Sequence, residues 1–267
     1  MPRSRRHHPR RRGLGGHGYF KRLGPGIVTG AADDDPSGIG TYSQTGAAFG
    51  YQLAWTSLLA LPFAVAVQEA TARLGLYSGK GLAALIKTHF RRWVLFLALA
   101  LVVGANTFNI GADLGSMAAA TNLVVPIPQV VLLVLFGFGI AALEIAIPYH
   151  RYARILRWLC LSLLSYLVVL FIVKVAWADV ASRLFLPRFE FSRPQIAALI
   201  AIFGTTISPY LFFWQTAEEV EELNDGGHDG PPTRAQLTAM RGDVVAGMSS
   251  GVVAMFAIMV TAAATLH

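Results

Sequence analysis

Two apolar stretches of this chain, each long enough to cross a bilayer, are interrupted at matching places by residues that break helices. The first interruption, residues 30–40, carries three consecutive aspartates directly before Pro36, and the second, residues 204–210, contains Pro209. Proline and glycine both disfavour a continuous helix, and charge at membrane depth marks an ion or substrate path by default. A pair of broken hydrophobic segments in corresponding halves of a chain therefore points to the binding site of a secondary transporter.

The composition places the chain among membrane proteins. Of its 267 residues, 54% are hydrophobic and 14% are charged, whereas a soluble domain carries about 25% charged residues. This balance excludes a globular soluble enzyme and predicts a polytopic membrane protein. The single cysteine, Cys160, excludes an intrachain disulfide and a cysteine-cluster metal site. Neither a nucleophile–base pair nor a His-Glu-x-x-His spacing occurs, so we expect no enzyme activity and no bound cofactor.

The apolar pattern predicts an all-α polytopic membrane protein with about seven transmembrane helices, of which the first and sixth are broken. Each apolar segment approaches the roughly 20 residues that a spanning helix needs. The predicted spans are residues 24–49, 51–76, 93–122, 127–147, 155–178, 195–217 and 244–267.

The net charge of +7 is unevenly distributed, and a large share of it lies in the first 22 residues. We predict that residues 1–22 form a basic, disordered cytoplasmic tail near anionic lipid headgroups. Residues 23–267 then form one transmembrane transporter domain. No folded nucleic-acid-binding module accompanies the tail, so the expected surroundings are membrane lipid, and nucleic acid is not an expected partner.

The loops between the spans assign the orientation by the positive-inside rule, which counts Lys and Arg and gives little weight to acidic residues. Two loops on the side of the basic tail are themselves basic, at Lys80, Lys87, Arg91, Arg92, Arg151, Arg154 and Arg157. The fifth–sixth loop is the one loop on the other side with positive charge, at Arg183, Arg188 and Arg193. The chain is therefore expected in a bacterial cytoplasmic (inner) membrane, with its N-terminus in the cytoplasm.

The two breaks offer hard oxygen ligands for a cation. Asp33, Asp34 and Asp35 cannot all face one ion, because neighbours on a helix point about 100° apart. Asp35, beside the proline, is best placed at the break itself, and the second break adds the carbonyl of Thr205 and the hydroxyl of Ser208. An all-oxygen site suits Mg²⁺, Ca²⁺ or Mn²⁺ better than soft metals.

The third span carries polar residues on one helical face. Asn106, Asn109 and Asp113 follow one another at spacings of three and four residues. Asp113 is predicted to line a proton or ion path. The two asparagines are predicted to form hydrogen bonds between helices. The alternative is that they line the same path as Asp113.

Several motifs together resemble the Nramp family of divalent-metal/proton transporters, and the resemblance covers nearly all of residues 22–267. The family's Asp-Pro-Gly-Asn motif aligns with Asp35-Pro36-Ser37-Gly38, and its sixth-helix Met-Pro-His motif aligns with Ser208-Pro209-Tyr210. The other matching stretches are Gly24-Pro25-Gly26, Thr45-Gly46-Ala47-Ala48-Phe49-Gly50-Tyr51, Gln68-Glu69-Ala70-Thr71-Ala72-Arg73-Leu74-Gly75 and Gly111-Ala112-Asp113-Leu114-Gly115-Ser116.

The resemblance implies a five-plus-five inverted-repeat (LeuT-like) fold, of which this chain supplies the first repeat and two helices of the second. It also implies metal contacts at Asp35 and at the Thr205 carbonyl. The family's metal-binding asparagine and methionine fall on Gly38 and Ser208, and its nearby histidine falls on Tyr210, which joins Asp113 as a candidate for the proton or ion path. Asp33 and Asp34 could compensate for the missing ligands.

The loss of the thioether removes the soft ligand that favours transition metals over alkaline earths. The expected function is therefore transport of a divalent cation such as Mg²⁺ or Mn²⁺ by alternating access, with proton symport as an open question. Two alternatives remain at this point. One is a Na⁺-coupled symporter of amino acids or other organic solutes, and the other is an inactive truncated remnant, because the chain ends inside its seventh span.

Overall fold

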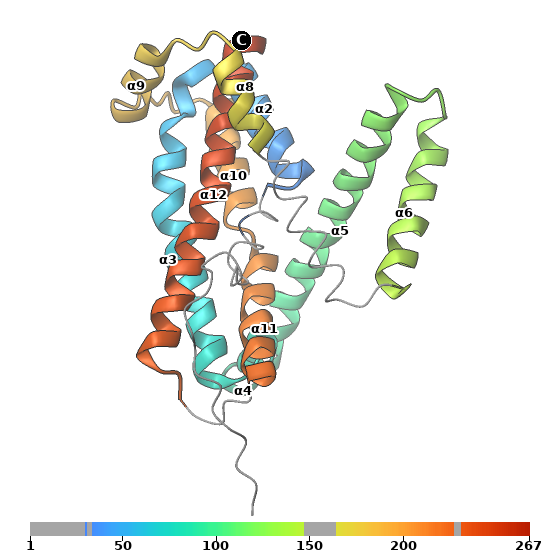
Figure 1. Cartoon of the computed structure of the whole chain (residues 1–267), viewed down its shortest axis with the longest axis vertical. Helices are drawn as coiled ribbons and strands as arrows, with labels where there is room; N and C mark the ends of the chain where they lie inside the picture. The colour runs from blue at the N-terminus through green and yellow to red at the C-terminus, as the bar shows by residue number, and fades with distance from the viewer. Residues whose placement is uncertain (1–29, 31–33, 147–163, 227–230) are drawn as a thin grey trace, which may run out of the picture.

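The computed structural model describes residues 30, 34–146, 164–226 and 231–267, and these residues form helices joined by turns (Figure 1). The first three elements are α2 (Pro36–Phe49), the 3₁₀ turn η2 (Gly50–Leu53) and α3 (Trp55–Ser78). They are followed by α4 (Leu82–His89), α5 (Arg92–Asn122), α6 (Gln129–Ala146), α8 (Leu164–Ile172), α9 (Trp177–Phe185), α10 (Arg193–Thr206), α11 (Pro209–Gly226) and α12 (Arg234–Leu266).

Both predicted breaks are present. Asp34 and Asp35 are not helical, and α2 begins at Pro36 with the proline in its first turn. The second break separates α10, which ends at Thr206, from α11, which begins at Pro209. A proline is tolerated at the start of a helix because its missing amide proton has no helical partner there, so each proline starts a new half-helix.

The helices match most of the predicted spans, with differences at the ends. The helices α5, α10–α11 and α12 are each long and apolar enough to cross a membrane, and α2–η2 and α3 are bent by 109° where they join. The last span was predicted from residue 244, but α12 begins at Arg234 because Thr233 and Gln236 form a capping box. The predicted tail 1–22 and parts of the first and fifth spans lie outside the described residues.

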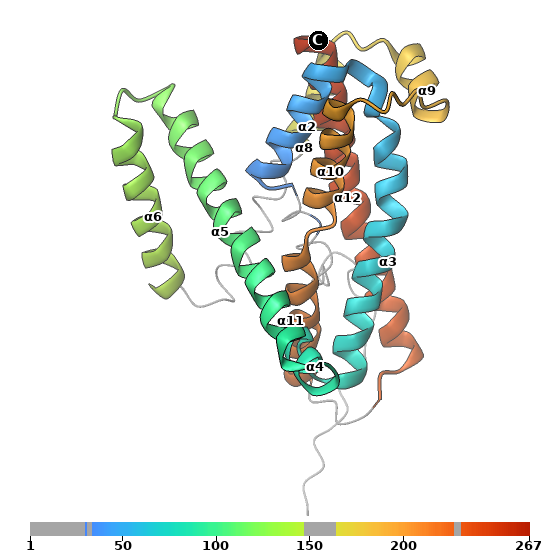
Figure 2. The same ribbon diagram turned by 180° about the vertical axis from the view of Figure 1, so that it is seen from behind.

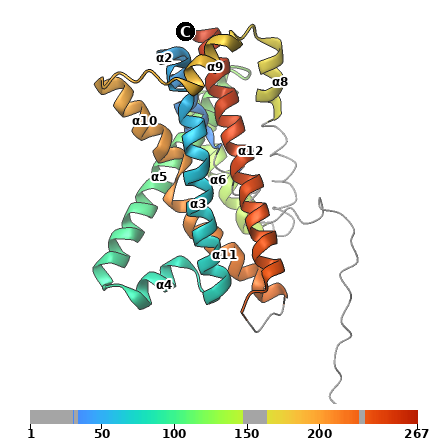
Figure 3. The same ribbon diagram turned by 90° about the vertical axis from the view of Figure 1, so that its left-hand side faces the viewer.

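Two short helices occupy segments that we predicted as loops or span ends. The prediction of one span over 155–178 is wrong at its end, because α8 stops at Ile172 and α9 starts at Trp177. The helix α4 fills the predicted second–third loop. Figure 3 shows α4 at one end of the molecule and α9 at the other, where α9 contacts η2. The basic second–third loop and the fifth–sixth loop therefore lie at opposite ends, as the charge pattern predicted.

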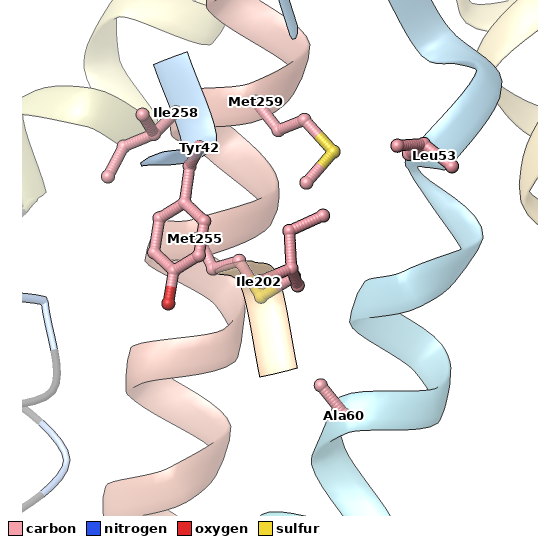
Figure 4. Packing of buried hydrophobic residues seen from close by; sticks show 7 residues of the cluster. All are labelled: Tyr42, Leu53, Ala60, Ile202, Met255, Ile258 and Met259. Atoms are coloured by element: carbon pink, nitrogen blue, oxygen red, sulfur yellow. The ribbon is translucent and has the colours of Figure 1, made fainter. Parts of the chain in front are cut away.

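The helices α2, α3, α10 and α12 form the centre of the molecule. Figure 4 shows seven buried side chains that meet between them: Tyr42, Leu53, Ala60, Ile202, Met255, Ile258 and Met259. The first and seventh spans approach closely through glycines. A Cβ atom added to Gly46 would lie 2.2 Å from the Met259 carbonyl oxygen, and one added to Gly30 would lie 2.0 Å from the Gly247 carbonyl oxygen. Such small residues permit close helix contact in membranes.

The hairpin of α5 and α6 leans away from this centre (Figure 2). Large apolar side chains such as Phe108, Phe138 and Ile145 are more than three-quarters exposed on it. The middle of α5 nevertheless contacts the first broken helix, where Asn109 supplies one residue of the site described next.

Candidate metal-binding site at the two helix breaks

Asp35 is held at the first break by the start of its own helix. It is the N-cap of α2. Its Oδ1 atom accepts hydrogen bonds from the Gly38 amide at 2.8 Å and from the Ser37 hydroxyl at 2.6 Å. Aspartate is a favoured N-cap because its carboxylate satisfies amide groups that the first turn leaves free. This local geometry fixes the carboxylate and leaves its second oxygen directed away from α2.

The second oxygen of Asp35 is contacted from two other helices. Oδ2 accepts a hydrogen bond from Asn109 Nδ2 on α5 at 3.2 Å and another from the Tyr210 hydroxyl on α11 at 3.3 Å. Tyr210 stands in the first turn after the second break. One carboxylate oxygen therefore joins the first broken helix, the second broken helix and the third span at a single point.

The second break is stabilised by its own polar groups. The Ser208 hydroxyl donates to the Thr205 carbonyl oxygen at 2.6 Å and lies 3.2 Å from the Gly204 carbonyl oxygen. Ser208 is 5% exposed. The Thr205 carbonyl lacks its usual helical donor, because residue 209, four positions on, is a proline without an amide proton. The two oxygens that we predicted as ligands, from Thr205 and Ser208, thus lie in direct contact with each other.

A buried hydrogen bond that the sequence did not indicate joins the two broken helices. The Tyr42 hydroxyl on α2 and the Thr206 hydroxyl at the end of α10 are 2.9 Å apart, and both side chains are buried. Thr206 also lies 3.8 Å from the Met255 sulfur on α12. Two half-helices that both border the site are therefore fixed to each other and to α12.

The remaining predicted residues are placed as follows. Gly38 is buried and its amide serves Asp35. Asp113 lies one turn beyond Asn109 on α5, and its Oδ1 atom is buried without a hydrogen-bond partner among the described residues. Asp34 is buried at the first break with its Oδ2 atom near Gly251 of α12, whereas Asp33 lies outside the described residues.

On the prediction that Asp35 is the metal ligand, loss of Asn109, which donates a hydrogen bond to Asp35, should weaken metal binding. We expect Asn109→Ala to lower the affinity for Mn²⁺ by about 10-fold, as is usual for a residue that orients a ligand from outside. Isothermal titration calorimetry on the purified protein checks this result. The matched control is Asn106→Ala, one turn earlier on α5, which leaves the contact with Asp35 in place and should change the affinity little. Equal effects of the two substitutions would contradict the role of Asn109.

The chain is similar in sequence to one protein family and to several known proteins. The sequence profile of the family described as "Nramp: Natural resistance-associated macrophage protein-like" matches residues 26–267. A divalent metal cation transporter MntH from Verminephrobacter eiseniae is 32% identical over 71% of this chain and 44% of its own length. The metal transporter NRAT1 of Oryza sativa subsp. japonica is 28% identical over 74% of this chain and 37% of its own length.

The fold is also similar to that of a solved transporter. The crystal structure of the Eremococcus coleocola manganese transporter, in complex with an aromatic bis-isothiourea substituted compound, superposes with a TM-score of 0.77 at 21% identity. The superposition covers 94% of this chain and 53% of that one, so the chain spans about half the length of the transporters that it resembles. The predicted helical transporter fold is confirmed, and the match of the family profile to nearly the whole chain shows that the protein belongs to the Nramp family.

Proposed function

We propose that this protein is a secondary transporter that moves a divalent metal cation, Mg²⁺ or Mn²⁺, across a bacterial inner membrane by alternating access. The N-terminus lies in the cytoplasm. Asp35 is the central ligand of the cation. The Thr205 carbonyl and the Ser208 hydroxyl supply neutral oxygens, while Asp113 and Tyr210 border the path of the cation or of a coupled proton.

The observation that carries this proposal is the position of the Asp35 carboxylate. It stands at the break of one helix and receives hydrogen bonds from α5 and from the first turn after the other break. A carboxylate at this depth needs a partner of opposite charge. The relatives named above are metal transporters by name, which supports a metal cation as that partner.

Alternating access requires that the binding site change its surroundings between two states. The contacts of Asp35 with Asn109 and Tyr210 are long, at 3.2 and 3.3 Å, and each joins different helices. A bound cation would interact with the carboxylate oxygen in place of the Asn109 and Tyr210 donors. Binding can therefore alter how α5 and α11 pack against the first helix, which is the coupling that a transporter needs.

Transport by the full-length protein in liposomes tests the proposal. We expect saturable uptake of ⁵⁴Mn²⁺ that excess Mg²⁺ inhibits, and no uptake of radiolabelled amino acids. Liposomes without protein provide the baseline. Amino-acid uptake without Mn²⁺ uptake would instead support the Na⁺-coupled organic-solute symporter and would reject the metal transporter.

The selectivity should depend on Ser208. Ser208→Met would replace a hard hydroxyl with a soft thioether and would also free the Thr205 carbonyl oxygen. We expect the affinity for Cd²⁺ to rise several-fold relative to that for Mg²⁺, since soft ligands favour soft metals. Calorimetric titration of both ions measures the ratio, with Ser182→Met on the exposed face of α9 as the control. An unchanged ratio would show that Ser208 does not contact the ion.

A further inference from the structure

The first break carries a second carboxylate that the proposed site does not use. Asp34 is 5% exposed, and neither of its carboxylate oxygens has a hydrogen-bond partner among the described residues. Its neighbour Asp35 accepts four hydrogen bonds, from Ser37, Gly38, Asn109 and Tyr210. An ionised carboxylate buried without a partner is strongly unfavourable, so such groups are paired or coordinate a metal.

The two carboxylates face different helices. Asp35 is directed toward α5 and α11, whereas the Oδ2 atom of Asp34 lies beside α12. A Cβ atom added to Gly251 of α12 would lie 3.6 Å from Asp34 Oδ2. The two carboxylates therefore have different neighbours, and Asp34 makes no hydrogen bond with Asn109 or Tyr210, the described residues beside the ion that Asp35 would hold.

A second oxygen meets Asp34 at the same place. The Gly30 carbonyl oxygen would lie 2.7 Å from that added Cβ atom of Gly251. Because Gly251 has no side chain, the backbone of α12 approaches both oxygens closely. Backbone carbonyls near the break of a helix are among the groups that coordinate small cations in transporters. We propose that Asp34 and the Gly30 carbonyl form a second cation site, separate from the site of Asp35.

The charges near Asp34 indicate which kind of cation the second site would bind. Among the described residues, the ion pairs of this chain involve Glu69 with Arg73 and Arg241, and no basic side chain pairs with Asp34. One carboxylate with neutral oxygens is balanced by a single positive charge. The occupant is therefore a small, hard monovalent cation, and Na⁺ is the probe. This inference does not rest on the proposed function, because it does not require that Asp35 bind a divalent ion.

The experiment measures thermal unfolding of the full-length protein in detergent, without divalent ions, as choline is replaced by Na⁺. A ligand that binds the folded state stabilises it. Saturating Na⁺ should raise the unfolding midpoint of the wild type by about 3 °C. Asp34→Asn should remove this response. In Na⁺-free buffer the same variant should be at least as stable as the wild type, because it removes an unpaired buried charge.

Asp35→Asn is the matched control, since it makes the same chemical change one residue away. It should keep the Na⁺ response while losing Mn²⁺ binding, which separates this inference from the assignment of Asp35. If Asp34→Asn does not fold, the proposal is still tested by whether Na⁺ raises the unfolding midpoints of the wild type and of Asp35→Asn. A wild type that binds Mn²⁺ but does not respond to Na⁺ overturns the second site. A Na⁺ response that Asp35→Asn abolishes also overturns it, because Na⁺ would then bind at Asp35.

Discussion

Replacement of Asp35 by asparagine should abolish divalent cation binding while leaving the protein folded. The substitution removes the negative charge that attracts the ion, so we expect the affinity for Mn²⁺ to fall about 100-fold or more. Asparagine is as good an N-cap as aspartate. The Gly38 amide and the Ser37 hydroxyl donate to Oδ1 of Asp35 in the wild type. The side-chain oxygen of asparagine can accept the same two hydrogen bonds. The start of α2 should therefore survive the change.

Calorimetry and thermal unfolding together check this expectation. Asp179→Asn is the control, because Asp179 lies exposed on α9 and the substitution changes the net charge by the same amount. The control should bind Mn²⁺ like the wild type. If Asp35→Asn binds Mn²⁺ normally, the central ligand lies elsewhere. If it fails to fold, Asp35 acts mainly in the structure of the break.

The second large effect concerns the packing of the first and seventh spans. In Gly46→Ala, the new methyl group would lie 2.2 Å from the Met259 carbonyl oxygen and 2.9 Å from the Ala263 amide nitrogen. Both atoms belong to the backbone of α12, so they can move only with the helix. Overpacking of this kind destabilises by about 3 kcal/mol. We expect a clear drop in the unfolding midpoint in detergent.

Gly40→Ala on the same helix is the control, because a Cβ atom there has no neighbouring atom within 4 Å. Alanine favours the helix over glycine by about 0.5–1 kcal/mol, so this variant should be as stable as the wild type or slightly more stable. A Gly46→Ala protein that unfolds at the wild-type temperature would show that α2 and α12 do not pack as described.

The sequence predicts the breaks because their causes are local. Pro36, after Asp35, and Pro209, after Ser208, each prevent a continuous helix through their own backbone chemistry. Asp35 becomes the N-cap of α2 because it directly precedes the proline that starts that helix. The contact of Asn109 with Asp35 was partly predictable, since the spacing of Asn109 and Asp113 places both on one face of the third span. The spacing alone could not predict that this face of the third span contacts Asp35 of the first.

Other features depend on contacts between distant residues. The hydrogen bond of Tyr42 with Thr206 joins positions 164 residues apart, and neither residue has a local pattern that marks it. The direction of Asp34 toward α12 follows from the irregular backbone at the break, where regular helical angles do not apply. The helices α4 and α9 were missed because eight or nine residues are too few for a transmembrane pattern.

The position of the bound ion tests the account most directly. Crystals of the full-length protein soaked with Mn²⁺ should give an anomalous scattering peak within about 2.0–2.6 Å of an Asp35 carboxylate oxygen. The account predicts this peak where α2, α10 and α11 meet, with Asn109 and Tyr210 nearby. A strong Mn²⁺ peak elsewhere in the protein, with none at Asp35, would contradict it.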